Sequence, residues 1–452
     1  MNSQLVVRRY LSGFVLVILL FLWLVPLPAA TDAETRTPPL QQGTLVLIGG
    51  ALAAPGDEIL NALKRSVTGL CRREGRHVPR VAFVPSSKQS LQQAHDDFEQ
   101  DDPDEPQRYP SYRTWFERAG FEPLLVPITQ ETVFDRRKAA EDARLADLIR
   151  SCQVVFLMGG DQGKHAMCLL RRDGSPSAAM MAIREVYERG GAVVGTSAGT
   201  HAMANPMFGW GESGLTILFS RLEPFTLSDL TPKLPVEPKR EGNCASVPGL
   251  GLLPSGMLTD THFDARGRLG RLLVGLRDLG LRWGIGVDEN TALFLQNGRG
   301  VVHGERGVFI VDTASATFSL PGEPFQARQV RVSLLTQGDI WQTTTGTIET
   351  SKPVVQNVAG AARFSSDVFS ATKTSSGDRA RPYETTLVMR SLGASADREV
   401  VARAWPPTAS IWVRFRKTTD TRVWGSALNS TIAHLVLDVD RIPFFKEHTS
   451  EP

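Results

Sequence analysis

Short apolar runs that alternate with helical stretches constrain the fold more than any other feature of this sequence. Runs at 44–48, 81–84, 154–158 and 192–195 each stop at glycine, serine or proline. Continuous apolar runs of this length are typical of strands buried on both faces of a parallel sheet. Because helical patterns lie between them, the sequence predicts a doubly wound, mostly parallel α/β sheet. Functional residues are then expected beyond the carboxyl ends of the strands.

Further elements follow from the same patterns. Helices are expected at 58–71, 112–119, 139–150 and 178–189, and one more strand is expected at 122–127. Near the C-terminus, four segments alternate between apolar and polar residues as strands do, namely 386–389, 400–404, 411–415 and 435–439.

The chain has 452 residues, which is room for two or three domains. Changes in composition divide it into a signal peptide or N-terminal anchor (1–30), a linker (31–42), an α/β domain (43–345), a Ser/Thr-rich linker (346–382) and a C-terminal β-rich extension of unknown role (383–452).

The N-terminal segment has the layout of a secretory signal. Arg8 and Arg9 precede an apolar run at 11–27, and the small pair Ala29 and Ala30 follows two prolines. An uncleaved membrane anchor is the alternative, although the run is slightly short of the roughly 20 residues that a bilayer span needs. A secreted or periplasmic protein is therefore expected.

Composition excludes several functions. The chain has 50 Lys and Arg against 48 Asp and Glu, and this balance argues against nucleic acid as a partner. The 4 cysteines form no CxxC pair and no HExxH occurs, so no metal site is predicted.

The strongest chemical motif is GTSAG at 195–199, between an expected strand and a helix-compatible stretch. G-x-S-x-G in this context is the pattern of a nucleophile elbow, which exposes the serine on a tight turn. The backbone N–H groups that follow can stabilise an oxyanion. Ser197 is therefore the candidate nucleophile, and the alternative is an inert serine in a glycine-rich turn.

A nucleophilic serine needs a base and an acid that orients the base. His262 follows an expected strand and fits best, whereas His201 and His165 are weaker candidates. Asp288 and Glu289 end another strand, and either carboxylate fits as the acid. The order serine, acid, histidine of α/β-hydrolases would instead require His303, which no other feature marks.

Five segments together resemble the cyanophycinases and, more distantly, aspartyl dipeptidases of the peptidase E group. They occur in the family's order: LIGG (47–50), MGGDQ (158–162), GTSAG (195–199), DTHFDARGRLGRL (260–272) and GVDENTA (286–292). The run HFxxRGRxxRL is the most specific of them. The resemblance implies a class I glutamine-amidotransferase-like α/β/α fold and a serine peptidase that needs no cofactor. It also implies cyanophycin, a polyaspartate with arginine on each β-carboxyl, as the substrate and the β-aspartyl-arginine dipeptide as the product.

Matched by position, the resemblance makes Ser197 the nucleophile, His262 the base and Glu289 the acid. It gives backbone N–H groups near Gly160 and Ala198 to the oxyanion hole. Positions that shape or read the substrate are Gln162, Asp260, Thr261, Arg266, Arg268 and Arg271. The three arginines can bind carboxylates through two parallel hydrogen bonds.

Two departures bear on the substrate. Thr261 stands where typical members carry glutamine, and Thr200 stands where alanine is usual. A hydrolase of other aspartyl or isoaspartyl peptides is therefore an alternative function, and a non-catalytic binding protein of the same fold is another. Family members are often dimers, so a homodimer is also implied.

Overall fold

The structure is a computed structural model. It describes residues 42–54, 57–134, 138–210, 222–230, 244–321, 323–355, 360–366, 368–370, 383–404, 411–426 and 429–440. The predicted leader at 1–30 lies outside the described residues, as does nearly all of the linker at 31–42. Within the described part of the chain, no helix has the length and apolar character required to cross a membrane.

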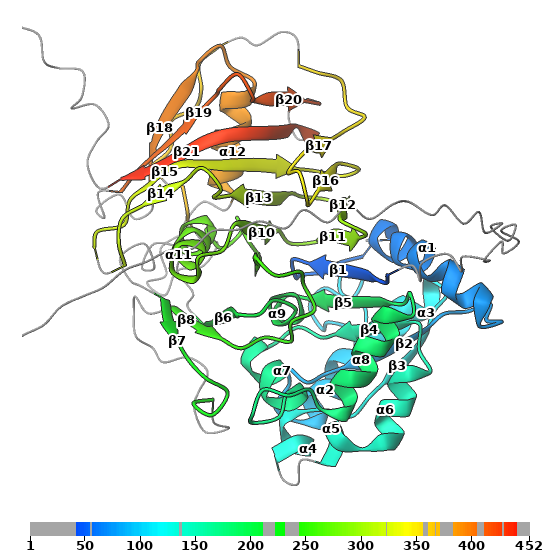
Figure 1. The fold of residues 1–452 in the computed structure, drawn as a ribbon. Helices are drawn as coiled ribbons and strands as arrows, with labels where there is room; N and C mark the ends of the chain where they lie inside the picture. Colours follow the sequence, from blue (N-terminus) through cyan, green and yellow to red (C-terminus); the bar gives the residue numbers. More distant parts are fainter. Residues whose placement is uncertain are drawn as a thin grey trace, which may run out of the picture. The chain divides into compact units, whose positions relative to one another are not determined.

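The first sheet holds the predicted βαβ units (Figure 1). Its strand order is β17-β16-β12-β11-β1-β5-β4-β2-β3, and the run from β1 to β3 is parallel. These parallel strands are β1 (Thr44–Ile48), β5 (Ala192–Thr196), β4 (Val154–Leu157), β2 (Arg80–Val84) and β3 (Glu122–Leu125). The antiparallel part of the sheet is formed by β11 (Thr291–Gln296), β12 (Arg299–Gly304), β16 (Ile340–Gln342) and β17 (Ile348–Glu349).

Helices cover both faces of this sheet. In β1, Leu45 and Leu47 join one apolar cluster, whereas Val46 and Ile48 join another, as the two-residue period of a strand requires. The cluster with Leu45 includes residues of α6 (Ala143–Arg150), α7 (Gln162–Leu169) and α8 (Ala178–Glu188). The opposite cluster includes residues of α1 (Asp57–Arg73), α2 (Leu91–Glu99) and α3 (Tyr112–Arg118).

Shorter helices complete this part of the chain. They are α4 (Gln130–Phe134), α5 (Lys138–Glu141) and α9 (Ala198–Ala202). The single helix predicted at 139–150 is wrong, because the chain breaks between α5 and α6. Asp142 has extended backbone there, and its carboxylate accepts a hydrogen bond from the Arg144 backbone N–H at 2.8 Å. This is an N-cap, so the residue starts a new helix.

A second sheet contains strands from the middle and the end of the chain. Its order is β18-β19-β21-β15-β13-β10-β9, with β14 and β20 paired at its side. The strands are β9 (Met257–Thr261), β10 (Trp283–Val287), β13 (Val308–Asp312), β14 (Thr317–Phe318), β15 (Ala327–Leu335), β18 (Glu399–Arg403), β19 (Trp412–Arg416), β20 (Arg422–Trp424) and β21 (Thr431–Asp440). Among the described strands of this sheet, β9 and β10 are the one parallel pair. The described residues therefore form two large sheets, whereas the sequence predicted one mostly parallel sheet with a C-terminal β-rich extension.

Residues beyond 383 continue this second sheet, since β21 pairs along β15. The strand predicted at 386–389 is wrong, because these residues lie in helix α12 (Glu384–Gly393). Its buried residues Thr385, Val388, Met389 and Leu392 recur at helical spacing. Together with α11 (Leu269–Leu279), α12 covers an apolar cluster on the second sheet. A three-stranded sheet of β6 (Met207–Trp210), β8 (Cys244–Val247) and β7 (Leu222–Pro224) completes the described fold.

Candidate active site

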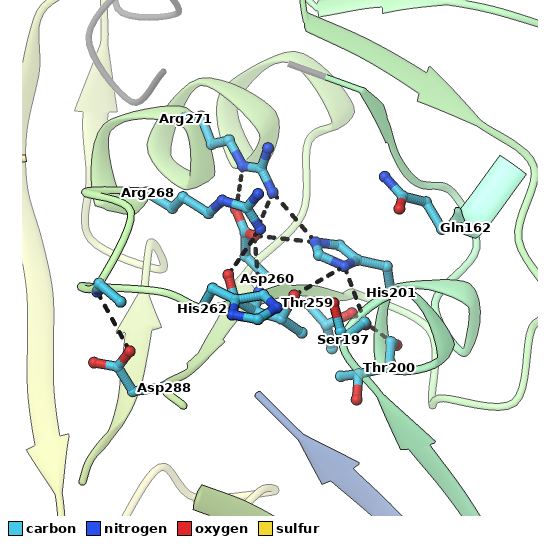
Figure 2. Close-up of polar contacts among 12 residues, drawn as sticks. Gln162, Ser197, Thr200, His201, Thr259, Asp260, His262, Arg268, Arg271 and Asp288 are labelled. Carbon is cyan, nitrogen blue, oxygen red and sulfur yellow. Dashed lines mark hydrogen bonds and ion pairs between the residues drawn. The ribbon is translucent and has the colours of Figure 1, made fainter. Parts of the chain in front are cut away.

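Three strand ends bring together the serine, histidine and glutamate predicted from the sequence. Ser197 follows β5 of the first sheet, whereas His262 and Glu289 follow β9 and β10 of the second. Ser197 Oγ lies 2.9 Å from His262 Nε2, and His262 Nδ1 lies 2.9 Å from Glu289 Oε1. Figure 2 shows the serine and the imidazole side by side. The site thus lies where the ends of the two sheets meet.

Ser197 occupies the strained turn expected of a nucleophile elbow. Its φ is +51° and its ψ is −112°, a conformation that L-residues rarely adopt. The turn needs glycine before it, since a Cβ on Gly195 would lie 2.4 Å from the carbonyl carbon of Gly199. The Ser197 N–H is held by the Ile48 carbonyl oxygen at 3.1 Å, which fixes the turn to β1.

His262 is held just as closely. Its φ is +46°, and its backbone N–H donates to the Gly49 carbonyl at 2.8 Å. A Cβ on Gly50 would lie 2.3 Å from His262 Nε2, so the backbone passes directly over the imidazole. Because Glu289 accepts the Nδ1 proton, Nε2 carries the lone pair and accepts from the Ser197 hydroxyl.

Electrostatics favour the neutral imidazole that a general base requires. Burial lowers the pKa of His262 to about 4; the hydrogen bond to Glu289 opposes this shift, and the charge of Arg266 adds to it. The hydrogen bond from His262 is in turn the main cause that lowers the pKa of Glu289. At neutral pH the pair therefore consists of a neutral histidine and a charged carboxylate.

The Gly159–Gly160 turn borders the serine, as the predicted oxyanion hole requires. A Cβ on Gly159 would lie 3.6 Å from Ser197 Cβ, and the Gly159 carbonyl accepts a hydrogen bond from the Ser87 hydroxyl at 2.7 Å. Ala198, the second predicted donor, is the first residue of α9. Gly160 and Ala198 therefore lie in segments next to Ser197, and the role of their backbone N–H groups in an oxyanion hole stays a prediction.

The other candidate histidines serve different contacts. His165 is fully buried, 2.6 Å from the Ser86 hydroxyl and 2.9 Å from the Met158 carbonyl oxygen. His303, on β12, stacks edge-on against Phe294 with 5.0 Å between ring centroids. These contacts place both histidines in packing roles, so among these three histidines only His262 contacts the Ser197 hydroxyl.

His201 belongs to a buried cluster beneath the serine. Its Nε2 lies 3.0 Å from Asp260 Oδ1, and its Nδ1 lies 3.2 Å from the Thr261 hydroxyl. Arg268 and Arg271 both donate to the Asp260 carboxylate, which is fully buried (Figure 2). Burial alone would raise the pKa of Asp260, but Arg271 and Arg268 outweigh it and hold the pKa well below its usual range.

This cluster changes the interpretation of the arginine run. The side chains of Arg268 and Arg271 are only 8% and 2% exposed. Their guanidinium groups contact the buried Asp260 carboxylate, so both arginines belong to the buried cluster around Asp260. Arg266 is exposed, and its charge acts on both His262 and Glu289. Of the three arginines, Arg266 is the exposed one, and its role toward a substrate stays a prediction.

Two further predicted substrate residues also have protein partners. The Gln162 side-chain amide donates to the Gly209 carbonyl at 2.5 Å. Thr261 is fully buried and faces His201. The substrate roles of both residues stay predictions.

Sequence patterns missed one group that adjoins the triad, Tyr383. The Tyr383 hydroxyl donates to Glu289 Oε2 at 3.1 Å, although 94 residues separate them. Asp264 is buried and accepts from the Thr386 backbone N–H at 2.8 Å. No local pattern marks Tyr383, because its role depends on contacts with a distant part of the chain.

Asp288, the alternative acid, points away from the imidazole. Its Oδ1 accepts from the backbone N–H groups of Ala265 and Glu289 at 3.3 and 3.1 Å. Burial, followed by the charge of Asp264, raises the pKa of Asp288 to about 8. Glu289 is therefore the carboxylate that orients His262. Among the described residues, no group of three or more His, Cys, Asp or Glu side chains is arranged to hold a metal ion.

Fold and geometry together define a class: an α/β protein with a serine, histidine and carboxylate relay at its strand ends. Comparison with known proteins agrees. The chain is 29% identical over 329 residues to a cyanophycinase of Trichormus variabilis, covering 70% of this chain and 90% of the relative. It is 26% identical over 314 residues to a cyanophycinase of Synechococcus elongatus, covering 68% and 81%. No family model matches the chain.

A search of solved structures finds a peptidase from an acI-B1 actinobacterium. It is 18% identical, with a TM-score of 0.43, and the match covers 67% of this chain and 98% of that one. The sequence relatives confirm the resemblance predicted from the motifs. The chain is a homologue of the cyanophycinases, and these relatives support a peptidase.

Proposed function

We propose that the protein is a serine exopeptidase that hydrolyses cyanophycin to β-aspartyl-arginine dipeptides. The observation that carries the proposal is the unbroken relay from Ser197 through His262 to Glu289, with 2.9 Å at each step. A class I glutamine-amidotransferase-like arrangement of the strands is part of the proposal. It is supported by the parallel strands with helices on both faces.

In the proposed mechanism, Ser197 Oγ attacks the scissile carbonyl carbon while His262 Nε2 takes the hydroxyl proton. Backbone N–H groups of Gly160 and Ala198 stabilise the oxyanion. His262 then gives the proton to the leaving amine, and an acyl-enzyme remains on Ser197. A water molecule loses a proton to His262 and attacks the ester; His262 returns this proton to Ser197 Oγ as the acid product leaves.

Substrate recognition is proposed to begin at Arg266. Its exposed guanidinium lies close enough to His262 and Glu289 to shift the pKa of each. Guanidinium groups bind carboxylates in a planar, two-bonded geometry, and cyanophycin presents carboxylates at its chain end and on its arginine groups.

One observation favours the second candidate, a hydrolase of other aspartyl or isoaspartyl peptides. Thr261 replaces the family's glutamine and is fully buried against His201, so it offers a substrate no equivalent amide. The residue that precedes the proposed base thus departs from the family pattern.

Product analysis separates the two functions. Purified protein is incubated with a cyanophycin suspension and, separately, with α- and β-aspartyl dipeptides, and the products are identified by mass spectrometry. Ser66→Ala, a change on α1 remote from the site, is the control for handling of the protein. Release of β-aspartyl-arginine from the polymer supports the first function. Cleavage of the dipeptides with an intact polymer would reject it for the second.

Export is also proposed, on the basis of the basic pair Arg8 and Arg9, the apolar run and the small residues at 29–30. N-terminal sequencing of protein recovered outside the cytoplasm should find a start near residue 31. Protein that begins at Met1 in that fraction would contradict a cleaved signal.

A further inference from the structure

The acid of the relay has a second partner from the C-terminal part of the chain. Glu289 Oε1 accepts from His262 Nδ1 at 2.9 Å, and Oε2 accepts from the Tyr383 hydroxyl at 3.1 Å. Each carboxylate oxygen therefore has its own donor. A carboxylate held at both oxygens cannot rotate without breaking one of the two hydrogen bonds.

Tyr383 is itself held in place. Its φ is +63°, an uncommon conformation for a residue with a side chain. The guanidinium of Arg306 lies over its ring, 3.9 Å from the ring centroid. This is a cation–π contact, which fixes the plane of the ring and the direction of the hydroxyl.

The residues after Tyr383 are attached to the loop that follows the base. Asp264, two residues after His262, accepts from the Thr386 N–H at 2.8 Å through its carboxylate and from the Tyr383 N–H at 3.4 Å through its carbonyl. Asp264 thus caps the first turn of α12, where the helix dipole favours a carboxylate. The Phe369 carbonyl lies against Gly267 in the same loop.

These contacts join the C-terminal segment to both partners of the nucleophile. One end of the connection is the loop that carries His262, and the other is the Glu289 carboxylate. A tyrosine that only filled space would not need a hydrogen bond from its hydroxyl to Glu289, a residue 94 positions earlier in the chain.

We propose that Tyr383 is a positioning residue of the relay. The C-terminal segment that carries Tyr383 would then contribute directly to the geometry of the active site. The inference rests on the proposed serine-peptidase function. Tyr383 acts through Glu289: its hydroxyl holds the carboxylate in the plane that His262 requires and draws electron density from it.

The charged and titratable groups around Glu289 make the consequence specific. They are His262, Tyr383 and Arg266, with the neighbouring Asp288. In Tyr383→Phe the carboxylate loses one hydrogen-bond donor, so it becomes more basic and pairs more strongly with the imidazolium. The pKa values of Glu289 and His262 should both rise. The acid limb of kcat/KM should therefore move to higher pH.

The test compares Tyr383→Phe with the full-length wild type. Kcat should fall about tenfold with KM within about twofold, and the acid limb should rise by about half a pH unit, as loss of one hydrogen bond to a charged group implies. Tyr187→Phe is the matched control, since it removes a phenol hydroxyl from α8 on the first sheet. It should behave as wild type.

Two readouts keep this test separate from the proposed function. The pH dependence of Ser197 labelling by a fluorophosphonate reports the relay without any peptide substrate, and NMR titration of ¹⁵N-histidine protein follows the pKa of His262 even in inactive protein. An upward shift in Tyr383→Phe supports the inference. A His262 pKa that is the same in Tyr383→Phe and wild type overturns the inference. This holds even if the variant is less stable or less active, because a purely structural role would leave the His262 pKa unchanged. Wild type that neither labels nor hydrolyses would instead reject the proposed function.

Discussion

Removal of the buried charge at Asp260 should destabilise the protein strongly. Asp260 is fully buried and meets Arg268, Arg271 and His201 at once. The conservative change Asp260→Asn keeps the shape but removes the carboxylate charge that both buried guanidinium groups contact. Loss of one partner from a buried ion pair costs about 3–5 kcal/mol in unfolding free energy.

Chemical denaturation at neutral pH measures this loss directly. The matched control is Asp420→Asn. The Asp420 side chain is 58% exposed and forms a surface ion pair with Arg331, so the change removes an exposed charge. Exposed pairs contribute about 0–1 kcal/mol, so the control should remain close to wild type. A value for Asp260→Asn within about 1 kcal/mol of wild type would refute the view that the arginines are held by Asp260.

The pH dependence of the same difference gives a second check. The cluster holds the pKa of Asp260 below that of the unfolded chain, so its contribution is fully present above the unfolded value of about 4. Below that pH, the unfolded carboxylate takes up a proton that the native state refuses, and wild type loses stability. The difference in unfolding free energy between wild type and Asp260→Asn should therefore become smaller as the pH falls below about 4.

Three other predictions follow from the site. Because the pKa of His262 is about 4, the acid limb of kcat/KM should lie well below the usual histidine value of about 6.5; a limb at or above that value would contradict the burial argument. Asp288 keeps its proton up to about pH 8, so between about pH 5 and 8 the native state binds a proton that the unfolded chain lacks, and stability should fall as pH rises. The unfolding free energy of Asp288→Asn should not show this decline between about pH 5 and 8. The same pH dependence in Asp288→Asn and wild type would contradict the raised pKa of Asp288. Gly50→Ala should lower kcat more than about tenfold, because its Cβ would lie 2.3 Å from His262 Nε2; near-normal kcat in folded protein would disprove that close approach.

The sequence was most informative where chemistry is local. A serine between glycines after an apolar run specifies the elbow, because only small residues fit that turn. Ser197 was predicted in this way, and the structure places its hydroxyl against His262. His262 was found because it ends a strand, and strand ends in such folds converge. Asp288 and Glu289 were both candidates at a second strand end, and the family resemblance selected Glu289.

The role of the arginines could not be predicted, because burial is a property of the tertiary structure. Arg268 and Arg271 have the spacing of a substrate-binding cluster, yet both contact Asp260 at the end of β9. Nothing in the linear pattern separates them from Arg266, which stays exposed.

The C-terminal part shows the same limit. Residues 386–389 alternate over too few positions to distinguish a strand from a helix, and the packing of α12 on the second sheet decided the outcome. The hydrogen bond from Tyr383 to Glu289 joins segments whose separation hides it from any local pattern.

The central claim is that Ser197 carries the acyl group, and one measurement tests it most directly. Wild type and Ser197→Ala are mixed with cyanophycin, and protein quenched during turnover is digested and analysed by mass spectrometry, together with the released dipeptide. We expect an ester on the peptide that contains Ser197, formed through the backbone carbonyl of an aspartyl residue whose β-carboxyl still carries arginine, and neither adduct nor dipeptide from Ser197→Ala. Dipeptide release by Ser197→Ala at the wild-type rate would contradict the account.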